Sequence, residues 1–348
     1  MIRMAVSGAG AIAERAHLPA LISTQGVQVV ALQSRTAEKA AGVAAKLWPD
    51  ASSRPAIYSD FDEMLAREKP GAVGIFTPNY LHCPLTLKAI AAGAHVLCEK
   101  PMASSASDGR RMVEAAHRAG KILMVTMQRR YGALEMAVKR AIDSGVIGTP
   151  NFIRARLSHG GPENWAPGQM WFVNPDQAGG GATLDLGVHV ADLALWYMGE
   201  PESVFGRVAT LDKRIDVDDT GAMLLRFRSG ALGVIEASWA SRPALSAIEI
   251  YGTAGRVMMG YPHNNFSILR ADGTPAPGYS YEEIKAQHDL RDLLAPFRAI
   301  AQNFVAAIEG NAAPNPDGRD GLRAIEVVEA CYRSSRSGKP VDFPLEQS

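Results

Sequence analysis

The sequence contains few cysteines and few aromatic residues, and its charges balance. Its 348 residues include 36 Lys and Arg against 36 Asp and Glu, and aromatic residues make up 7% of the chain. This balance excludes the overall basic character that is typical of nucleic-acid-binding proteins. The three cysteines (Cys83, Cys98 and Cys331) lack the spacing of a zinc site, so we expect reduced, buried thiols and no bound metal.

Long hydrophobic runs and a leader segment are also missing. No stretch approaches the ~18 uninterrupted apolar residues that a membrane span needs. From Met1 the chain enters a strand pattern directly, without the charged and then apolar segments of a signal peptide. The composition, 47% hydrophobic and 21% charged, is that of an ordinary globular protein. We therefore expect a cytoplasmic protein that binds neither membranes nor nucleic acid.

The first 125 residues alternate short apolar runs with helical patterns. Strands are predicted at 3–7, 27–33, 73–76, 96–98 and 122–125, and helices at 11–23, 37–47, 61–67, 84–92 and 104–119. This alternation predicts a doubly wound parallel sheet that is covered by helices on both faces. We assign residues 1–125 to this first domain.

The pattern changes after about residue 150. Strands are predicted at 152–158, 204–211, 222–228, 231–239 and 248–251, with helices at 183–197, 292–308 and 320–335. Glycine-containing turns between several of these strands favour hairpins. The sequence therefore predicts a second domain, residues 126–348, of the α+β class with a mainly antiparallel sheet.

A glycine motif supports nucleotide binding. Gly8-Ala9-Gly10-Ala11-Ile12-Ala13 fits G-x-G-x-x-G/A, follows the first strand and opens a helix, which is the context that gives the motif its force. Gly8 permits the tight turn, and Gly10 lets backbone N–H groups approach a pyrophosphate. We expect Gly8, Gly10, Ala11 and Ile12 to contact the cofactor, and residues 1–125 to form a dinucleotide-binding Rossmann domain.

The residues after the second strand bear on which cofactor binds. An acidic residue about 20 positions after the glycines would favour NAD, but the chain has Gln33-Ser34-Arg35-Thr36 and no carboxylate before Glu38. Ser34 offers a hydroxyl, and the guanidinium of Arg35 suits a 2′-phosphate. We expect NADP(H) to be preferred over NAD(H). Stacking of Arg35 on the adenine, or a solvated Arg35 that confers no preference, are the alternatives.

Three further segments carry a family resemblance. They are Thr77-Pro78-Asn79-Tyr80-Leu81-His82, the run from Gly93 to Glu99-Lys100-Pro101, and the run from Gly179-Gly180-Gly181 to Asp185-Leu186-Gly187-Val188-His189. Together they resemble the glucose–fructose oxidoreductase, inositol dehydrogenase and rhizopine catabolism (Gfo/Idh/MocA) family, over nearly the whole chain. The resemblance implies a Rossmann domain followed by an α+β domain with a large open sheet, which commonly forms homodimers or homotetramers.

The resemblance also implies a catalytic set. In the family the lysine that matches Lys100 touches both the nicotinamide ribose and the substrate hydroxyl. Lys100 follows a strand end, where ligands collect in an open parallel sheet. Asp185 and His189 are four residues apart on one predicted helix, so their side chains are expected about 5–6 Å apart. Histidine, which titrates near neutrality, is suited to take a hydroxyl proton. We expect a sugar or cyclitol alcohol to bind between the domains, with Lys100, Asp185 and His189 catalytic.

Weaker signals mark other positions. The resemblance implies cofactor contacts at Thr77, Pro78 and Asn79, with help from His82 and from Glu99 beside Lys100. Arg130, Tyr131 and Trp171 are candidate substrate contacts, and Trp165 is a weaker one. Asp192 either orients the His189 ring or is structural.

Three functions remain open at this point. The first is an NAD(P)-dependent dehydrogenase or reductase that acts on a secondary alcohol or ketone of a sugar, glycoside or cyclitol. The second is an NAD-dependent glycosidase that oxidises its substrate transiently, and the third is a non-catalytic nucleotide-binding sugar sensor. Lys100, Asp185 and His189 argue against the sensor, while the substrate and the physiological direction stay undetermined.

Overall fold

The computed structural model describes residues 1–164, 166, 168–261 and 265–346. These residues form two compact units, the first comprising 1–131 and 293–322 and the second 132–292 and 323–348. The sequence analysis assigned all of 126–348 to one domain. The structure instead groups residues 293–322 with the dinucleotide-binding part of the chain.

The first unit contains a six-stranded sheet in which every pair of neighbouring strands is parallel. Its order is β3-β2-β1-β4-β5-β6. The strands are β1 (Ile2–Ser7), β2 (Val27–Gln33), β3 (Ala56–Tyr58), β4 (Ala72–Ile75), β5 (His95–Cys98) and β6 (Leu123–Val125). This is the order of a Rossmann sheet, in which ligands collect beyond the carboxyl ends of β1 and β4, where the strand order reverses. The predicted doubly wound sheet is confirmed.

Helices connect these strands. They are the π-helix η1 (Ala13–His17), α1 (Leu18–Ser23), α2 (Ala37–Leu47), α3 (Phe61–Glu68), α4 (His82–Ala91) and α5 (Ala106–Ala119). Local signals explain the bounds of α5. The Ser105 side chain accepts a hydrogen bond from the backbone N–H of Asp108, and Gly120 ends the helix with a φ of 62°.

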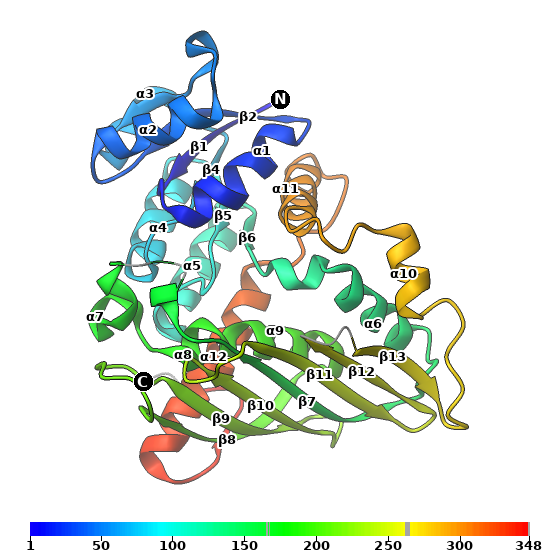
Figure 1. The fold of residues 1–348 in the computed structure, drawn as a ribbon. Coiled ribbons are helices and arrows are strands. Elements are labelled where there is room, and N and C mark those ends of the chain that lie inside the picture. Colours follow the sequence, from blue (N-terminus) through cyan, green and yellow to red (C-terminus); the bar gives the residue numbers. More distant parts are fainter. Residues whose placement is uncertain (165, 167, 262–264, 347–348) are drawn as a thin grey trace. The chain divides into compact units, whose positions relative to one another are not determined.

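Helix α11 (Ala295–Ile308) completes the core of the first unit. Ile300, Ala301, Phe304 and Val305 lie on one helix face and are buried in the same cluster as residues of β1, β2 and α1. Figure 1 shows α11 beside α1. This apolar contact is the physical reason why a segment so distant in sequence belongs to the Rossmann unit.

The second unit contains an eight-stranded sheet in the order β13-β12-β11-β7-β10-β9-β8-β14. All neighbours are antiparallel except β7 and β10, which are parallel. The strands are β7 (Pro150–Ser158), β8 (Pro201–Ala209), β9 (Thr220–Phe227), β10 (Leu232–Ser238), β11 (Leu245–Gly252), β12 (Gly255–Tyr261), β13 (Asn265–Arg270) and β14 (Val341–Asp342). The predicted mainly antiparallel sheet is confirmed.

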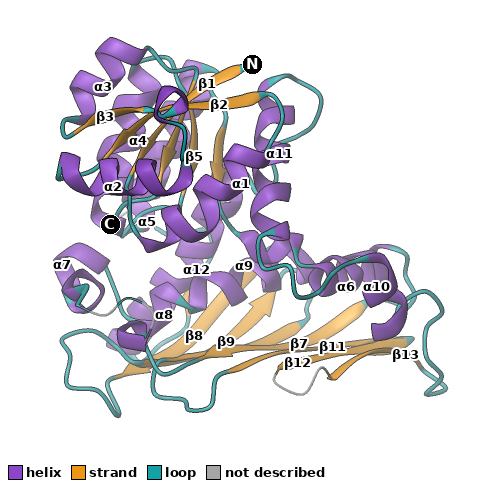
Figure 2. Cartoon of the chain, turned by 45° about the horizontal axis from the view of Figure 1, so that its top comes forward, coloured by secondary structure: helices purple, strands orange, loops and turns teal. Residues whose placement is uncertain are grey.

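Helices cover one face of this sheet (Figure 2). They are α6 (Ala133–Asp143), α8 (Ala182–Asp185), α9 (Gly187–Met198), α10 (Tyr281–Gln287) and α12 (Gly318–Ser337). The short α7 (Pro175–Ala178) lies in the connection before α8. The alternation of burial along the strands reflects the helix cover. In β9, Met223 and Leu225 are buried toward the helices, whereas Leu224 and Arg226 are exposed on the other face.

Candidate active site

The first unit carries the glycine loop at the carboxyl end of β1. Gly8 has a φ of +101°, and a Cβ atom placed on it would lie 2.3 Å from the Phe76 carbonyl oxygen. The Gly8 N–H donates to the Gln33 carbonyl oxygen (2.9 Å). The loop is therefore packed between the ends of β2 and β4 so closely that only glycine fits.

The next residues of the loop are open. A Cβ atom placed on Gly10 would meet nothing within 4 Å, and Ile12 is exposed. The chain then enters η1, where the Leu18 N–H donates to the Ala13 carbonyl oxygen, so the helix predicted at 11–23 is π-helical in its first part. The open space over Gly10 suits the close approach of a pyrophosphate to the backbone.

The end of β2 lacks a carboxylate. Both polar atoms of the Gln33 side chain form hydrogen bonds within the protein. Its Oε1 accepts from Ser7 Oγ (2.7 Å), and its Nε2 donates to the Ser59 carbonyl oxygen (3.0 Å). Ser34 is buried, and its backbone N–H donates to the Tyr58 carbonyl oxygen (3.2 Å). Arg35, the next residue, is exposed.

The segment after β4 presents an unsatisfied hydroxyl. Thr77 Oγ1 is buried and has no hydrogen-bond partner in the described part of the chain. A buried polar atom without a partner is costly, and a bound ligand would supply the missing bond. Asn79, two residues on, is also buried. Thr77 and the open space over Gly10 are the two features of this unit that fit a dinucleotide.

His82 is fully buried and holds two backbone segments. Its Nδ1 lies 2.8 Å from the Pro101 carbonyl oxygen and its Nε2 lies 2.7 Å from the Thr77 carbonyl oxygen. Burial lowers the pKa of His82 below its usual value, against the opposing effect of these two carbonyls. With both ring nitrogens facing the backbone, His82 supports the loops after β4 and β5, and its nitrogens are not available for the predicted cofactor contact.

Lys100 follows β5 and is anchored through its neighbour Glu99. Glu99 is 7% exposed; its Oε2 accepts from the Lys100 backbone N–H (2.8 Å), and its Oε1 lies 2.7 Å from His17 Nε2 and 2.8 Å from Thr126 Oγ1. Burial alone would raise the pKa of Glu99, but His17, Lys100 and Thr126 together lower it. Glu99 therefore remains a carboxylate whose two oxygens bind the protein and anchor the Lys100 backbone, while its predicted cofactor contact stays a prediction.

Arg130 and Tyr131 lie in the 3₁₀ turn η4 (Gln128–Tyr131). The Arg130 guanidinium is buried, donates to Asn315 Oδ1 (3.1 Å) and pairs with Asp320 (3.2 Å). The Tyr131 hydroxyl donates to the Asn315 carbonyl oxygen, and burial raises the pKa of Tyr131 to about 12. Both polar groups therefore bind residues 293–322 of their own unit, and their predicted contacts with the substrate stay a prediction.

The second unit carries Asp185 and His189, which are 7% and 6% exposed. The continuous helix predicted at 183–197 is wrong. Asp185 ends α8, and His189 lies in the first turn of α9, where its N–H donates to the Leu186 carbonyl oxygen (3.2 Å). Trp239 Nε1 donates to Asp185 Oδ2 (3.3 Å), so the carboxylate is oriented by a buried indole at the end of β10.

A buried carboxylate that the sequence analysis missed fixes the start of α8. Asp218 accepts hydrogen bonds from the N–H of Gly181 (2.9 Å), from the N–H of Thr183 (2.8 Å) and from the Tyr332 hydroxyl (2.7 Å). A Cβ atom on Gly181 would lie 1.8 Å from the Asp218 carbonyl oxygen, and one on Gly180 would lie 2.3 Å from the Tyr332 oxygen. These contacts explain why two of the three consecutive positions are glycine. The Asp218 carboxylate also acts as an N-cap of α8, the helix that contains Asp185.

Trp171 lies in the short turn η6 (Met170–Val173) before α7. Its Nε1 donates to Gln169 Oε1 (2.9 Å), and its ring stacks on Phe172 with centroids 3.7 Å apart. It is partly exposed, so part of its surface remains accessible. Trp165 lies outside the described residues.

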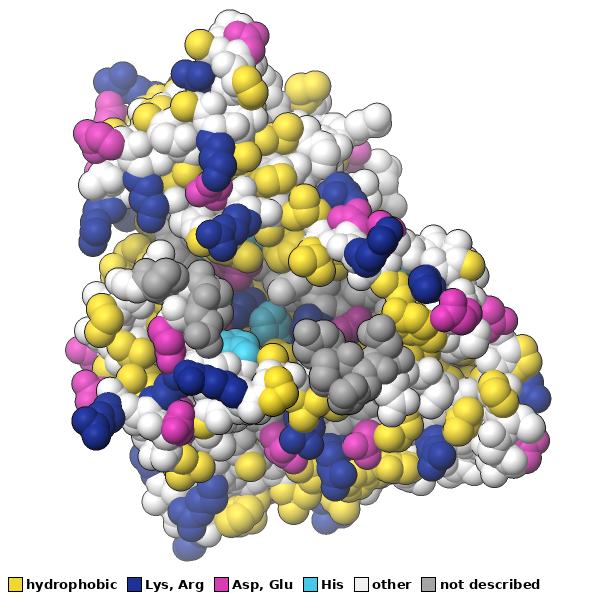
Figure 3. Space-filling view, in the orientation of Figure 1, with side chains coloured by type: hydrophobic (Ala, Val, Ile, Leu, Met, Phe, Trp, Pro, Cys, Tyr) yellow, Lys and Arg dark blue, Asp and Glu magenta, His cyan; other side chains and the backbone are white. Residues whose placement is uncertain are grey.

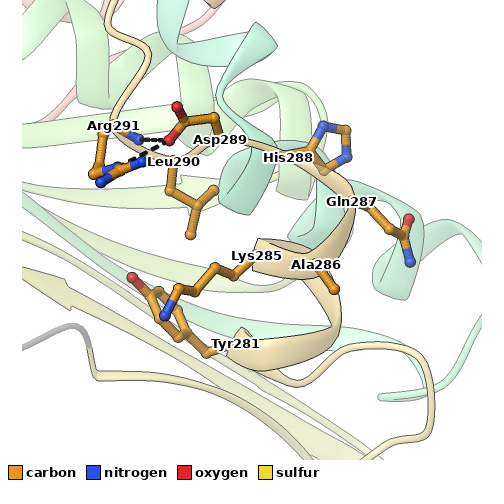
Figure 4. A pocket seen from close by; sticks show the side chains of 8 residues that line it. All are labelled: Tyr281, Lys285, Ala286, Gln287, His288, Asp289, Leu290 and Arg291. Carbon is orange, nitrogen blue, oxygen red and sulfur yellow. Dashed lines mark hydrogen bonds and ion pairs between the residues drawn. The ribbon is translucent and has the colours of Figure 1, made fainter.

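Two hollows in the second unit lie apart from Asp185 and His189. The larger, of about 730 Å³, is formed by Tyr281 of α10 and residues 285–291, with an Arg291–Asp289 ion pair at one side (Figure 4). A smaller one of about 370 Å³ opens beside Gly180, Asp218 and Tyr332. Across the described ranges, no cluster of three His, Cys, Asp or Glu side chains is placed to hold a metal ion, and no helix has the length and apolarity of a membrane span.

The sheet order and the glycine loop define a dinucleotide-binding protein, and comparison with known proteins gives its family. A sequence model described as "Oxidoreductase family, NAD-binding Rossmann fold" matches residues 2–127, and one described as "GFO/IDH/MocA C-terminal domain" matches residues 136–258. The chain belongs to the Gfo/Idh/MocA family and is an NAD(P)-dependent oxidoreductase.

Individual relatives cover almost the whole chain. A 1,5-anhydro-D-fructose reductase from Ensifer adhaerens is 30% identical over 99% of both chains. An inositol 2-dehydrogenase from Rubrobacter xylanophilus is 29% identical over 90% of this chain and 85% of its own. The WlbA dehydrogenase from Bordetella pertussis, solved with NADH and UDP-GlcNAcA, is 30% identical with a TM-score of 0.89 over 99% of this chain and 98% of that one.

Proposed function

We propose that the chain transfers a hydride between a nicotinamide dinucleotide and a secondary alcohol or ketone of a sugar, glycoside or cyclitol, with Lys100, Asp185 and His189 as its catalytic residues. The observation that carries this proposal is the placement of Lys100. It lies two residues after β5, where the buried carboxylate of Glu99 accepts from its backbone N–H. Thr77, with its unsatisfied hydroxyl, lies two residues after the neighbouring strand β4. Both groups lie at the carboxyl edge of the sheet, where ligands of such sheets bind.

The cofactor, when bound, supplies the nicotinamide that accepts or donates the hydride. Gly8, Gly10, Ala11 and Ile12 would hold its pyrophosphate, and Thr77, Pro78 and Asn79 its nicotinamide half. The Lys100 ammonium donates a hydrogen bond to the substrate oxygen and stabilises negative charge that develops there. His189 takes the hydroxyl proton during oxidation and returns it during reduction. Asp185, oriented by Trp239, binds a neighbouring hydroxyl or His189.

A substrate screen tests this function. The panel contains pyranoses, inositols, glycosides, keto-sugars and UDP-linked sugar acids, chosen because relatives are named for such compounds. Each is incubated with NAD(H) and with NADP(H) while the nicotinamide absorbance is followed. Net oxidation or reduction of a panel member supports the proposal. Release of free sugar without net cofactor reduction would identify the glycosidase, and binding without turnover would identify the sensor.

We further propose that NADP(H) is preferred over NAD(H). Arg35 is exposed two residues after β2, and the chain has no carboxylate between Gln33 and Glu38 that could bind a ribose 2′-OH. Replacing Arg35 with alanine is expected to weaken NADPH binding about 10- to 100-fold, because hydrogen bonds to charged groups contribute about 1.5–3 kcal/mol. NADH binding should change little.

Fluorescence titration of both dinucleotides measures this difference. Arg67→Ala is the matched control, because Arg67 is an exposed residue of the same unit that pairs with Glu63 on α3. Tighter binding of NADH than of NADPH by the unaltered protein would contradict the preference.

The protein is proposed to be a homodimer or homotetramer that associates through the open face of the eight-stranded sheet. Phe205, Leu224 and Val234 lie opposite one another on β8, β9 and β10, and Phe205 and Leu224 are exposed. Ion pairs such as Arg226–Glu202 surround them, and Figure 3 shows basic, acidic and hydrophobic side chains intermixed over the lower part of the second unit. Such a mixed face, with exposed large apolar groups, suits an interface.

Leu224→Lys is expected to shift the protein toward monomers, because it places a charge in this apolar row. Light scattering after gel filtration measures the mass. Leu211→Lys, at an exposed loop residue, serves as the control. An unaltered protein that is already monomeric would contradict the proposed assembly.

The three cysteines are free and buried, which supports a cytoplasmic location.

A further inference from the structure

His17 is a buried histidine of the first unit to which the sequence analysis assigned no role. It is 3% exposed, and its Nε2 lies 2.7 Å from Glu99 Oε1. Because an ionised carboxylate only accepts hydrogen bonds, His17 Nε2 carries the proton in this contact. The Glu99 carboxylate in turn accepts from the backbone N–H of Lys100. A single side chain thus separates His17 from the backbone of the proposed catalytic lysine.

The position of His17 follows from the π-turn η1. The Leu18 N–H bonds to the carbonyl oxygen of Ala13, five residues earlier, so this turn is wider than an α-helical one. His17 is the last residue of the turn, and the turn begins three residues after Gly10. Single π-turns are frequently found at functional sites. Here the turn directs a side chain from the glycine-loop helix to the end of β5.

The ring of His17 is also fixed in its plane. It stacks on Phe76, the residue after β4, with centroids 3.9 Å apart and planes at 10°. Phe297 of α11 contacts it edge-on, with centroids 5.1 Å apart. Phe76 is the residue whose carbonyl oxygen packs against Gly8. The ring therefore joins the glycine loop and the ends of β4 and β5.

Glu99 receives a third constraint from Thr126, the residue after β6, whose hydroxyl donates to the same Oε1 (2.8 Å). The pKa of Glu99 is held below its usual value although burial opposes ionisation. A buried carboxylate of this kind depends on its donors. Removing His17 would leave Oε1 with one donor fewer, and relaxation of Glu99 would be transmitted directly to the Lys100 N–H.

We propose that His17 is a positioning residue for the reaction, which through Glu99 fixes Lys100 relative to the helix that follows the glycine loop. The inference rests on the proposed function, because it takes Lys100 as catalytic. It assigns to His17 no contact with substrate or cofactor. Its effect is expected on the chemical step and on the environment of Lys100, not on dinucleotide affinity.

The first test is kinetic. His17→Ala is expected to lower kcat about 10- to 100-fold, because small displacements of a catalytic group are costly, with the Kd of the dinucleotide changed less than about threefold. His17→Gln should restore most of kcat, since its amide reaches as far as Nε2 and donates, whereas His17→Asn reaches only as far as Nδ1 and should not. In a Glu99→Gln background, His17→Ala should have little further effect.

The control is His95→Ala. His95 begins β5 at the opposite end from Lys100, and its Nδ1 accepts from the Ile122 N–H (3.0 Å). Like His17→Ala, this variant removes a histidine side chain that makes a hydrogen bond near β5, but it does so far from Lys100. It should therefore lower Tm while leaving kcat unchanged. If His17→Ala behaves like His95→Ala, or if His17→Gln and His17→Asn have equal kcat, His17 is only structural and the inference is overturned. If His17→Ala does not fold, the inference is tested by comparing kcat of His17→Gln with kcat of His17→Asn.

A second readout does not depend on turnover. Acetylation of Lys100 by limiting acetic anhydride, followed by mass spectrometry across a pH series, reports the environment of its amine. The profile should change in His17→Ala, return in His17→Gln and stay unaltered in His95→Ala; an unchanged profile in His17→Ala overturns the inference. A chain that oxidises no panel compound yet shows the expected labelling would refute the proposed function while preserving the link between His17 and Lys100.

Discussion

Replacing Lys100 with alanine is expected to lower kcat by about 10²–10⁴-fold, while the dinucleotide still binds. The variant removes the ammonium group that would stabilise charge on the substrate oxygen. It leaves the glycine loop intact, because the turn at Gly8 is held by backbone contacts with Gln33 and Phe76. Steady-state kinetics with the substrate from the screen, together with fluorescence titration of NADPH, separate these two effects.

Lys88→Ala provides the matched control for Lys100. Lys88 lies on α4 of the same unit and pairs with Asp62 (2.6 Å) at the surface, so its loss should change kcat little. Lys100→Arg adds a second comparison, since it keeps the positive charge but replaces a compact donor with a planar one. Near-normal turnover by Lys100→Ala would remove Lys100 from the catalytic set and, with it, the observation on which the proposed function rests.

Elements with strong local signals were predictable from the sequence. The bounds of β2 and α2 agree with the predicted ranges 27–33 and 37–47. β2 is an apolar run, and α2 has apolar residues at helical spacing. β3, with three residues, was missed because so short a strand forms only by pairing with β2. α6 and α10 were missed as well. α11 could not be assigned to the first unit because its partners in β1, α1 and β2 end at Gln33, whereas α11 begins at Ala295.

The site was predictable to the extent that its residues form local motifs. The glycine loop and the Glu99-Lys100-Pro101 segment are contiguous in sequence, so their types and spacing could be interpreted directly. Asp218 bonds to Thr183, 35 residues away, and His17 bonds to Glu99, 82 residues away. The local sequence around Asp218 and His17 does not indicate these partners. Arg130 gives a further example. Its position after the last Rossmann strand predicts a substrate contact, but its local sequence does not reveal that Asp320 pairs with it inside the fold.

Replacing His189 with alanine is expected to reduce kcat for alcohol oxidation by about 10²–10⁴-fold, the range that general-base catalysis contributes. The loss should be specific to the proton-transfer step, because His189 has no assigned contact with the dinucleotide. In the unaltered enzyme, oxidation should slow at low pH as the base becomes protonated, and this acidic limb should be absent in the variant. The pH dependence of kcat/KM, measured for both proteins, tests the assignment.

His288→Ala is the control for His189, because His288 is an exposed histidine of the same unit just beyond α10. A further variant, Trp239→Phe, removes the hydrogen bond to Asp185 and part of the buried ring volume but keeps an aromatic side chain at this position. If His189 is the base and Asp185 orients it or the substrate, Trp239→Phe should reduce kcat less than His189→Ala and retain the acidic limb. If His189→Ala keeps that limb, a different group takes the proton. If it keeps normal turnover, His189 is not the base, and the catalytic set is reduced to Lys100 and Asp185.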